Sequence, residues 1–411
     1  MRILLLTHYY APETGPPQLR WSSLVRDLVG AGHEVDVITP APHYPTGRLL
    51  PGEDPAQVGR QQLGEHGERV HRVGFRPSTG SARSLLVDQG VAAAHTVATA
   101  WRRRAALDPD VVVATVPGIP TAVAGRAVAT SLRVPLVLEM RDAWPDLLGG
   151  VASATDNAPR DAARAVVVRG AAAAVRALQR SANLVVTTTD SFAATLRERG
   201  VRHVVTVRNA YHPVAGLPEP SATPREPGAL RVVYVGTIGR AQGLETALHA
   251  VGLARQAGVE LSLRVVGTGA RLASVRALAR ELQVPVQFVG PVPREEVADH
   301  YAWCDTFLVS LRDWPGLGST VPSKLYEALA LGLHVSASAT GETADIVRET
   351  GAGFAAPPGD ADALARGWVE LAERGPRPDT GRMRRWVEAH ASERGAAAVL
   401  LDALSGLRSR G

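Results

Sequence analysis

The feature that most constrains the fold of this chain is a repeated alternation of two kinds of segment. Short runs rich in Val, Ile, Leu and Thr alternate with longer runs rich in Ala, Leu and Arg. Short and almost continuously apolar runs are typical of strands buried on both faces, whereas the longer runs have the length and composition of helices. The alternation therefore predicts an α/β protein whose parallel sheets are covered by helices on both sides.

The alternation occurs twice, on either side of residues 211–228, a segment rich in Pro and Gly that is typical of a linker. The expected strands are 2–7, 34–39, 69–75, 111–115, 136–140, 184–188 and 204–207, then 231–236, 260–266, 286–289, 305–310 and 333–337. The expected helices are 17–30, 82–104, 119–131, 159–182 and 190–199, then 243–257, 270–282, 294–302, 322–331, 342–349, 360–373 and 380–408. We expect two doubly wound Rossmann-like domains, residues 1–210 and 229–385, facing a central cleft at the carboxyl ends of their strands.

Composition excludes several classes of protein. With 45% hydrophobic and 21% charged residues, the chain has the balance of a soluble globular protein. It contains no run of about 18 apolar residues that would span a membrane, and its opening MRILLLT is too short for a signal sequence. The single cysteine, Cys304, permits neither an intrachain disulfide nor a cysteine metal cluster, so a cytoplasmic location is the default expectation.

The chain is basic, with a formal net charge of +5 and a pI of about 9.8. This balance favours anionic substrates or a membrane surface as partners. Nucleic acid is not expected, because no basic helix with interleaved aromatic residues and no nucleic-acid-binding motif is present. Since arginine supplies nearly all the positive charge and Ala and Gly are abundant, the same composition is also typical of a GC-rich genome.

The segment GLGSTVPSKLYEALALG, near the middle of the second domain, predicts a glycine-bearing loop that leads into a helix. Pro322 suits the first helical position, which would make Val321 a cap without a side-chain oxygen. The amide N–H groups of Ser323 and Lys324 are then unpaired, and Lys324 puts a cation where the helix dipole disfavours one. A bound phosphate or diphosphate would relieve all three faults. An imperfectly capped surface helix explains this segment equally well.

Four loops that follow strands of the second domain carry glycine, including the one just described. The other three contain Gly236, Gly239 and Arg240; Gly267 and Gly269; and Val292. One such loop alone is weak evidence, although glycine permits close approach of the backbone to a ligand. Four at one edge of a sheet predict a nucleotide pocket, in which Glu327, three residues after Lys324 on the helix, would bind ribose hydroxyls.

Polar and aromatic residues follow three strands of the first domain. They are Gly15 and Arg20, at the start of the helix after the first strand, His43 and Tyr44 after the second, and Arg141, Asp142 and Trp144 after the strand at 136–140. Because the carboxyl ends of parallel strands meet at one edge, these residues form a candidate site. A solvated arginine at position 20 and a structural ion pair beside a packed tryptophan are the alternatives. No zinc helix motif, P-loop or nucleophile elbow is present, and Asp108-Pro-Asp110 precedes a strand, as a turn does.

Together these motifs resemble those of the GT-B glycosyltransferases of family 4, a large retaining family. Within that family the chain is most similar to the branch that builds O-antigen, capsule and colanic-acid-type exopolysaccharides. The resemblance rests on HYYAPETGPPQLRW, PHYPTG, RDAWPD, GTIGRAQGLE, VPSKLYEALALG and AAPPGD. It covers nearly the whole chain, including the last segment, 386–411, which in that fold crosses back to the first domain. It is specific for the fold and the class of reaction, and poorly specific for the sugar and the acceptor.

The resemblance implies a nucleoside diphosphate sugar as donor, UDP-linked in our interpretation, with no metal or other cofactor. The implied donor-binding residues are Gly15, Gly236, Gly239, Gly267, Gly269, Val292, Ser319, Thr320 and Ser323. The residues implied to carry the reaction are Arg240, Lys324, Glu327 and Asp142. The implied acceptor-binding residues are Arg20, His43, Tyr44, Arg141 and Trp144. The acceptor is expected to be a lipid-linked saccharide or a small molecule, and front-side attack with retention needs no protein nucleophile.

Two departures from the family pattern affect this interpretation. The family often carries two glutamates separated by seven residues; Glu327 matches the second, and Ser319 stands in place of the first. Thr237 and Gln242 stand near the positions where the family often carries Arg and Lys. We therefore expect Arg240 and Lys324 to supply the charge that faces the diphosphate, and a serine at position 319 favours a deoxy or N-acetylated donor sugar.

Two other functions stay open at this stage. A non-hydrolysing NDP-sugar 2-epimerase shares the two-domain architecture, and a non-catalytic partner subunit would bind the nucleotide sugar without turnover, an idea that Ser319 favours. The stretch 81–104, which ends in Trp101-Arg-Arg-Arg104, is consistent with peripheral contact to an anionic membrane surface. An ordinary surface helix with a basic end is the alternative interpretation of that stretch.

Overall fold

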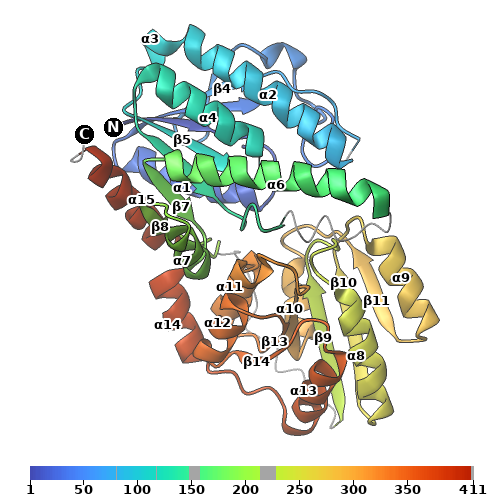
Figure 1. Cartoon of the computed structure of the whole chain (residues 1–411). Coiled ribbons are helices and arrows are strands. Elements are labelled where there is room, and N and C mark those ends of the chain that lie inside the picture. Colours follow the sequence, from blue (N-terminus) through green and yellow to red (C-terminus); the bar gives the residue numbers. More distant parts are fainter. Residues whose placement is uncertain (80, 117, 148–157, 213–227, 409–411) are drawn as a thin grey trace. The chain divides into compact units, whose positions relative to one another are not determined.

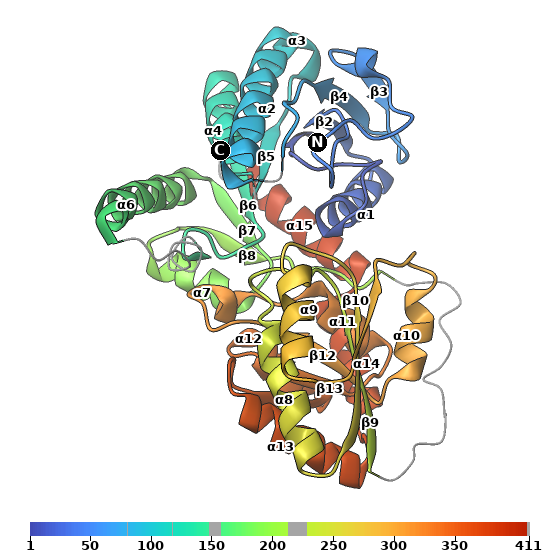
Figure 2. The same ribbon diagram turned by 90° about the vertical axis from the view of Figure 1, so that its right-hand side faces the viewer.

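The computed structural model describes residues 1–79, 81–116, 118–147, 158–212 and 228–408, and it confirms the predicted α/β class. The chain divides into two compact units: unit 1 comprises Met1–Asn209 and Glu393–Gly411, and unit 2 comprises Ala210–Ser392. In each unit a central sheet carries helices on both faces (Figures 1 and 2). The returning segment, expected at 386–411, begins at Glu393, and most of the expected linker at 211–228 lies outside the described residues.

Unit 1 contains an eight-stranded sheet of order β3-β4-β2-β1-β5-β6-β7-β8. Its strands are β1 (Arg2–Leu6), β2 (Glu34–Pro40), β3 (Gln61–Leu63), β4 (Arg69–Val73), β5 (Val111–Val116), β6 (Leu136–Met140), β7 (Leu184–Thr187) and β8 (Val204–Thr206). Its helices are α1 (Pro16–Gly30), η1 (Pro55–Gln57), α2 (Ala82–Arg102), α3 (Arg104–Leu107), α4 (Ile119–Leu132), α6 (Ala158–Ser181), α7 (Asp190–Glu198) and α15 (Glu393–Arg408). Every described strand pair is parallel except β3 with β4, and β3 is a strand that the sequence did not predict.

Alternate side chains of the unit 1 strands pack into two separate hydrophobic cores, one on each face of the sheet. Leu4 and Leu6 of β1 face one cluster, to which α2, α4, α6 and α7 contribute. Ile3 and Leu5 face the other, to which α1 and α15 contribute. This alternation follows from the two-residue period of a strand, and it explains why the strands look continuously apolar in the sequence.

Unit 2 contains a six-stranded, fully parallel sheet of order β11-β10-β9-β12-β13-β14. Its strands are β9 (Ala229–Val235), β10 (Glu260–Val266), β11 (Val286–Gly290), β12 (Thr306–Ser310), β13 (Val335–Ser338) and β14 (Gly353–Ala356). Its helices are α8 (Leu244–Gln256), α9 (Leu272–Glu281), α10 (Val297–Trp303), η2 (Leu317–Ser319), α11 (Ser323–Ala330), α12 (Glu342–Thr350), α13 (Ala361–Arg374) and α14 (Thr380–His390). Strand β14 was not predicted from the sequence.

The expectation of one helix over 380–408 is wrong. The structure has two helices, α14 in unit 2 and α15 in unit 1, with a break at Ala391–Ser392. The carbonyl of Ala391 accepts a hydrogen bond from the amide of Tyr211 at 2.8 Å, so the end of α14 is held to the start of unit 2. The helical pattern of the sequence runs through this break because it records only local apolar spacing and not the division into units.

Candidate functional site

Helix α11 begins one residue later than the sequence predicted. Pro322 is its N-cap, with φ −62° and an extended ψ of 132°, so the expectation of Pro322 in the first turn and Val321 as the cap is wrong. A φ near −65° suits proline at both positions, and only ψ, which the sequence does not reveal, separates them. Pro322 offers no side-chain cap, and within the described part of the chain neither the Ser323 nor the Lys324 amide N–H has a protein acceptor. The helix therefore presents the unpaired N–H groups that bind anions.

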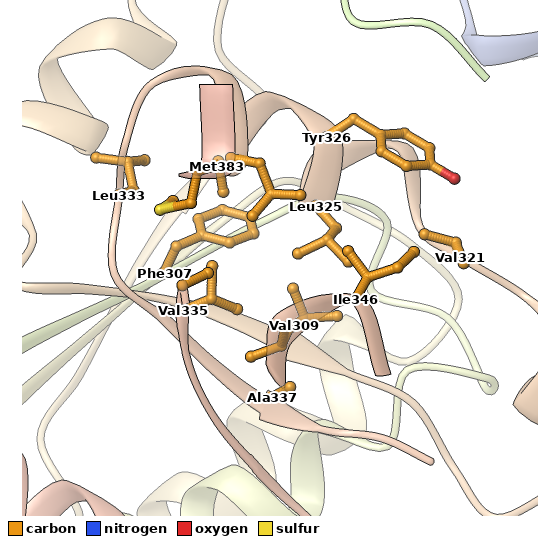
Figure 3. Close-up of a cluster of buried hydrophobic side chains, with 14 of the residues drawn as sticks. Phe307, Val309, Val321, Leu325, Tyr326, Leu333, Val335, Ala337, Ile346 and Met383 are labelled. Carbon is orange, nitrogen blue, oxygen red and sulfur yellow. The ribbon is translucent and has the colours of Figure 1, made fainter. Parts of the chain in front are cut away.

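The core of unit 2 fixes where this helix end lies. Figure 3 shows Leu325 and Tyr326 of α11 packed among buried side chains that include Phe307 of β12 and Val335 of β13. Leu325 and Tyr326 have no exposed surface. Helix α11 is thus anchored along one side, and its N-terminus stays at the end of the loop that follows β12.

Lys324, Glu327 and Tyr301 form a compact charged group beside this helix end. Lys324 Nζ donates to Glu327 Oε2 at 2.7 Å and to the Tyr301 hydroxyl at 3.2 Å. Burial, with the neighbouring Glu327 carboxylate, raises the pKa of Tyr301, so its hydroxyl stays protonated. Glu327 is 8% exposed, and its Oε1 has no hydrogen-bond partner among the described residues. A buried carboxylate oxygen without a donor is costly, and ligand hydroxyls would satisfy it.

Lys324 is the only lysine in the chain, whose other basic residues with permanent charge are all arginine. A composition this poor in lysine makes one more arginine the default at any position that needs only a positive charge. A compact ammonium differs from a guanidinium in size, in donor geometry and in hydration. Lys324 thus places a compact ammonium group between Glu327 and the Tyr301 hydroxyl.

The predicted glycine loops do come together at one edge of the unit 2 sheet. Their backbones are joined by hydrogen bonds from Gly236 to Val266 at 3.0 Å, from Ile238 to Thr268 at 2.9 Å, from Gly267 to Gly290 at 2.7 Å and from Arg312 to Ala241 at 2.8 Å. A Cβ on Gly267, where φ is +132°, would lie 2.0 Å from the Gly236 carbonyl oxygen, and one on Gly269 would lie 2.4 Å from that of Ile238. Only glycine allows these loops to pack so closely.

The strand order places these loops around a topological switch point. The chain runs outward from β9 to β10 and β11, then returns to β12 on the other side of β9. In such sheets ligands bind outside the carboxyl ends of the strands at the place where the order reverses. The loop after β9, with Gly239 and Arg240, and the loop after β12, which leads into α11, are the two that border this point.

The remaining predicted donor residues lie in or next to these loops. Arg240 is exposed, and its carbonyl accepts from Arg312 Nε at 2.8 Å. Ser319 ends η2, and Thr320 bonds back to the Gly316 carbonyl at 3.2 Å. Val292 packs against the core that anchors α11. Gly15 is the exception, because it is the N-cap of α1 in unit 1.

Sequence reasoning missed a cluster at the same edge of unit 2. The two carboxylate oxygens of Glu245 form ion pairs with different arginines. A terminal nitrogen of Arg271 lies 2.8 Å from Oε1, and a terminal nitrogen of Arg312 lies 2.8 Å from Oε2. Burial alone would raise the pKa of Glu245, but the hydrogen bond from Arg271 and the charge of Arg312 hold it below its usual value. Arg312 follows β12 by two residues, and this spacing is the signal that would have identified it.

In unit 1, Arg20 does not lie free to meet an anion, as we expected. Its Nε donates to Glu139 at 2.8 Å, and its terminal nitrogens donate to the carbonyls of Arg208 and Val207, each at 2.8 Å. It is 4% exposed, so neither the acceptor-binding interpretation nor the solvated alternative describes it. The physical reason is that Glu139, at the end of β6, is buried and needs a charged partner.

The acceptor-binding prediction at His43 falls on a buried polar cluster that also contains His8 and Asp88. Asp88 Oδ2 lies 3.2 Å from His8 Nε2 and 3.0 Å from His43 Nε2, while His43 Nδ1 lies 2.8 Å from the Ala41 carbonyl oxygen. A carbonyl and a carboxylate oxygen are both acceptors, so in the absence of a metal ion this geometry favours a doubly protonated, positively charged ring. Burial lowers the pKa of His43, but the hydrogen bonds to Asp88 and to the Ala41 carbonyl, with the charges of Asp88 and Glu13, together outweigh burial and raise the pKa.

This cluster was not predicted, because Asp88 is a lone acidic residue in an apolar helix, α2. The sequence feature that could have indicated the cluster is the pair of histidines, His8 and His43, that follow the neighbouring strands β1 and β2. A buried carboxylate that reaches both, Asp88, completes it. One ligand atom from each of the three residues lies within 4.8 Å of the others, so the group could also hold a metal ion. No other such group was found among the described residues.

The other predicted acceptor residues surround this edge of unit 1. Tyr44 is 38% exposed, and its ring meets Tyr9 edge-on with centroids 5.3 Å apart. Trp144 packs against the core next to β6, and burial lowers the pKa of Arg141 and raises that of Asp142. Tyr9, which the sequence did not single out, adds an aromatic face beside Tyr44.

The two doubly wound units define the class of two-domain α/β proteins known as GT-B. Two family models match the chain, a glycosyl transferase 4-like domain at residues 17–212 and glycosyl transferases group 1 at residues 229–374. The chain therefore belongs to the GT-B glycosyltransferases, as its motifs predicted.

Curated relatives match over one part of the chain. A probable glycosyltransferase WbjE of Pseudomonas aeruginosa is 35% identical over 144 residues, which is 34% of this chain and 35% of that protein. The amylovoran biosynthesis glycosyltransferase AmsK of Erwinia amylovora is 30% identical over 147 residues, 35% of this chain and 36% of the relative. The matched segment thus spans about a third of the length of each relative.

Solved structures match over the whole chain and support the fold. Sucrose-phosphate synthase from Thermosynechococcus elongatus has a TM-score of 0.72 at 20% identity and covers 100% of this chain and 99% of its own. Anabaena Alr3699/HepE in complex with UDP has a TM-score of 0.64 at 16% identity and covers 99% and 100%. A search of the described helices found none that is long and apolar enough to cross a membrane.

Proposed function

We propose that this protein is a retaining glycosyltransferase that takes a sugar from a UDP-linked donor. The observation that carries the proposal is the N-terminus of α11, where two unpaired amides, the single lysine of the chain and a half-satisfied buried carboxylate meet at the switch point of unit 2. The UDP complex of HepE, a protein of the same fold, supports UDP as the nucleotide.

Each group at this edge has a role that its chemistry suits. Glu327 accepts hydrogen bonds from the ribose hydroxyls through Oε1, while Lys324, Arg240 and the Ser323 amide bind the diphosphate. The base lies against the loops that contain Gly267–Gly269 and Val292. The leaving group gains negative charge as the glycosidic bond breaks, and preorganised cations with a helix N-terminus stabilise that charge without a metal.

The chemical step transfers the sugar with retention by front-side attack. The acceptor oxygen forms the new bond to the anomeric carbon, the bond from that carbon to the phosphate oxygen breaks, and the acceptor proton passes to the leaving phosphate. No protein nucleophile is needed. Asp142 positions the acceptor hydroxyl, and Ser319, in place of a family glutamate, favours a deoxy or N-acetylated sugar; unchanged donor preference in Ser319→Glu would contradict this.

The acceptor binds at unit 1 and belongs to exopolysaccharide or glycolipid assembly in the cytoplasm. The relatives that share sequence with the chain include an amylovoran biosynthesis enzyme, which supports a saccharide acceptor. The aromatic faces of Tyr44 and Trp144 suit the apolar faces of a sugar ring, and His43 and Arg141 suit its hydroxyls or a lipid-linked phosphate.

Calorimetric titration of UDP, GDP, ADP and TDP into the wild type and Glu327→Gln tests the donor assignment. Binding of UDP alone, lost in the variant but kept in the exposed control Glu370→Gln, is the expected result. If no nucleotide binds, the assignment of this site is wrong. Product analysis with UDP-sugars and no acceptor separates the alternatives, because an epimerised nucleotide sugar would identify an isomerase.

A further inference from the structure

Strands β9 and β12 are held together by the unit 2 sheet at one end only. Among the described residues, β12 is paired with β9 through only Thr306 and Phe307, its first two residues, whereas β9 and β10 are paired along seven positions. The remainder of β12, up to Ser310, has no partner in β9. Since these two strands flank the switch point, the loops that follow them at the ligand-binding edge are not held together by the sheet itself.

Hydrogen bonds from the end of β12 take over this task, because three successive carbonyls of the loop after β9 accept them. Arg312 donates to two, from Nε to the Arg240 carbonyl at 2.8 Å and from its amide to the Ala241 carbonyl at 2.8 Å. The Ser310 hydroxyl donates to the Gln242 carbonyl at 2.6 Å. We call these three bonds the β12 brace. They fix the segment through its carbonyls, and within the described part of the chain its three amide N–H groups have no protein acceptor.

The Arg312 side chain is itself fixed along its length. Its stem lies against Gly243, where φ is +57° and an added Cβ would lie 2.8 Å from Arg312 Cγ, so only glycine leaves room for it. Beyond the stem, a terminal nitrogen pairs with Glu245 in the first turn of α8 at 2.8 Å. Glu245 is in turn held by Arg271, in the segment that follows β10. One side chain from β12 therefore connects the loop after β9 with the start of α8.

We propose that Arg312 is a positioning residue that aligns Arg240 with the diphosphate of the donor. Arg240 lies in the loop after β9, and Lys324 lies on the helix that follows β12, so the two cations come from opposite sides of the switch point. A loop that is ordered before the ligand arrives lowers the entropic cost of binding and keeps the cation in the productive geometry. This inference rests on the proposed function, and it assigns no contact between Arg312 and the substrate.

The same two strands provide a matched control at their other ends. Arg231 of β9 donates from Nε and from a terminal nitrogen to Asp305, just before β12, at 3.2 and 3.0 Å. The side chains of this pair are 21% and 7% exposed, against 37% and 24% for Arg312 and Glu245. Because the Arg231 pair is the more buried, its loss should destabilise unit 2 at least as much as loss of the Arg312 side chain. The two arginines differ in which end of the strands they join.

Hydrogen exchange tests the β12 brace without any ligand. Arg312→Met removes the guanidinium and retains an unbranched stem against Gly243. The amide of Gly239, bonded to Gln242 Oε1 at 3.1 Å, and the amide of residue 312, bonded to the Ala241 carbonyl, report on the loop. We expect both to exchange about tenfold faster in Arg312→Met, the scale of one lost hydrogen bond, and at the wild-type rate in Arg231→Met. Unchanged exchange in Arg312→Met would overturn the proposal.

Calorimetric titration of UDP measures the consequence for the donor site. Arg312→Met should bind UDP about tenfold more weakly than the wild type, the scale of one hydrogen bond to a charged group, whereas Arg231→Met should bind it as the wild type does. Equal losses in the two variants, or no loss in Arg312→Met, would overturn the positioning role. If the wild type binds no UDP, the proposed function is wrong and this role falls with it, whereas the hydrogen-exchange result still decides whether Arg312 orders the loop.

A double-mutant cycle shows whether Arg312 acts through Arg240. Arg240→Met alone should lower UDP affinity about tenfold. In the Arg312→Met background the same substitution should have little further effect, because the Arg240 guanidinium is already out of place. Cooperative thermal unfolding of each variant confirms that it is folded. If the two losses multiply as independent effects, Arg312 does not act through Arg240 and the inference is overturned.

Discussion

The two units have closely similar sheets but place their charged residues in opposite ways. Among the described residues, unit 1 buries seven Asp, Glu or Arg side chains and unit 2 buries two. Those of unit 1 are Glu13, Arg20, Asp36, Glu68, Arg72, Asp88 and Glu139, and those of unit 2 are Glu327 and Glu342. Unit 2 instead keeps Arg240 exposed and Lys324 partly exposed, at the carboxyl edge of its sheet.

Under the proposed function, the buried charges of unit 1 support the structure, whereas the charges at the edge of the unit 2 sheet bind the ligand. In unit 1 the buried groups bond mainly to protein partners, as Tyr10 does to Glu68 at 2.7 Å and Arg20 to Glu139 at 2.8 Å, and they hold the loops after the strands. In unit 2 the carboxylate of Glu327 keeps one oxygen without a partner among the described residues. Unit 1 should therefore respond to mutation mainly in stability, and unit 2 mainly in binding and turnover.

The largest effect that tests this contrast is expected at Arg20. Arg20→Met removes the ion-pair partner of the buried Glu139 carboxylate, which keeps the hydrogen bond from Trp21 Nε1 at 2.7 Å. Breaking a buried ion pair in this way costs about 3–5 kcal/mol of unfolding free energy. Arg26→Met, at an exposed pair with Asp27 and Glu393, should cost less than about 1 kcal/mol. Denaturant unfolding, followed by hydrogen exchange in β6 and in β9, gives the size and the location. Equal loss of protection in both units would contradict the separation.

Lys324 tests the other side of the comparison. Lys324→Ala and Glu327→Ala should each lower turnover at least about a hundredfold, the scale of one preorganised contact to developing charge. Lys324→Arg should also lower turnover, because a guanidinium differs from the ammonium beside Glu327 and Tyr301 in size and in donor geometry. None of the three substitutions should alter the unfolding free energy of unit 1. Near-wild-type turnover in any of the three would defeat the site assignment.

Chemical labelling adds a direct measurement at the same residue. Because the chain has one lysine, an amine-directed reagent can modify only Lys324 and the α-amino group. UDP should protect Lys324 and leave the α-amino group reactive. Equal labelling with and without UDP would show that the nucleotide does not reach this helix end.

Gly267→Ala sharpens the comparison within unit 2. Its Cβ would lie 2.0 Å from the Gly236 carbonyl oxygen at a φ of +132°, so the loops after β9 and β10 must separate. We expect nucleotide affinity to fall about tenfold, since backbone strain of this kind is on the order of 1–3 kcal/mol. Gly258→Ala is the matched control, because its φ is +93° but nothing lies within 4 Å of the added carbon. Equal affinities in the two variants would mean that loop packing does not shape the pocket.

The sequence predicted the parts of the molecule that depend on local pattern. Buried parallel strands, glycine at strand ends and the segment around Lys324 are all readable because each requirement falls on neighbouring residues. Strand β3 was not predicted because Gln61, Gln62 and Leu63 are all exposed. An exposed edge strand of this kind has no apolar run in its sequence. Strand β14 was not predicted because its residues, Gly353–Ala356, are mostly small and do not form a β-branched run.

Long-range partners were beyond prediction from the sequence. Arg20 and Glu139 are 119 residues apart, and Asp88 lies 80 residues from His8 and 45 from His43. No spacing rule connects such positions before the sheet order is known. An arginine that follows a strand predicts an anion contact equally well whether the anion is a ligand or a buried glutamate, and only the fold separates the two.

The smallest expected effect concerns His43 and is a matter of pH. Asp88 and the Ala41 carbonyl bond to its ring, with Glu13, His8 and Phe75 around it, and the net result raises its pKa above the unfolded value of 6.5. A group with a raised pKa contributes its full stabilisation when the pH is below its pKa in the unfolded state. This stabilisation is lost as the pH rises through its pKa in the folded state. The wild type should therefore exceed His43→Gln in unfolding free energy by about 1 kcal/mol at acid pH, the scale of one hydrogen bond, and by less at alkaline pH.

Adding a chelator distinguishes a charged His43 ring from a bound metal ion as the partner of Asp88. An unchanged pH profile means that the charged ring pairs with Asp88, whereas a loss of stability at neutral pH means that a metal ion does.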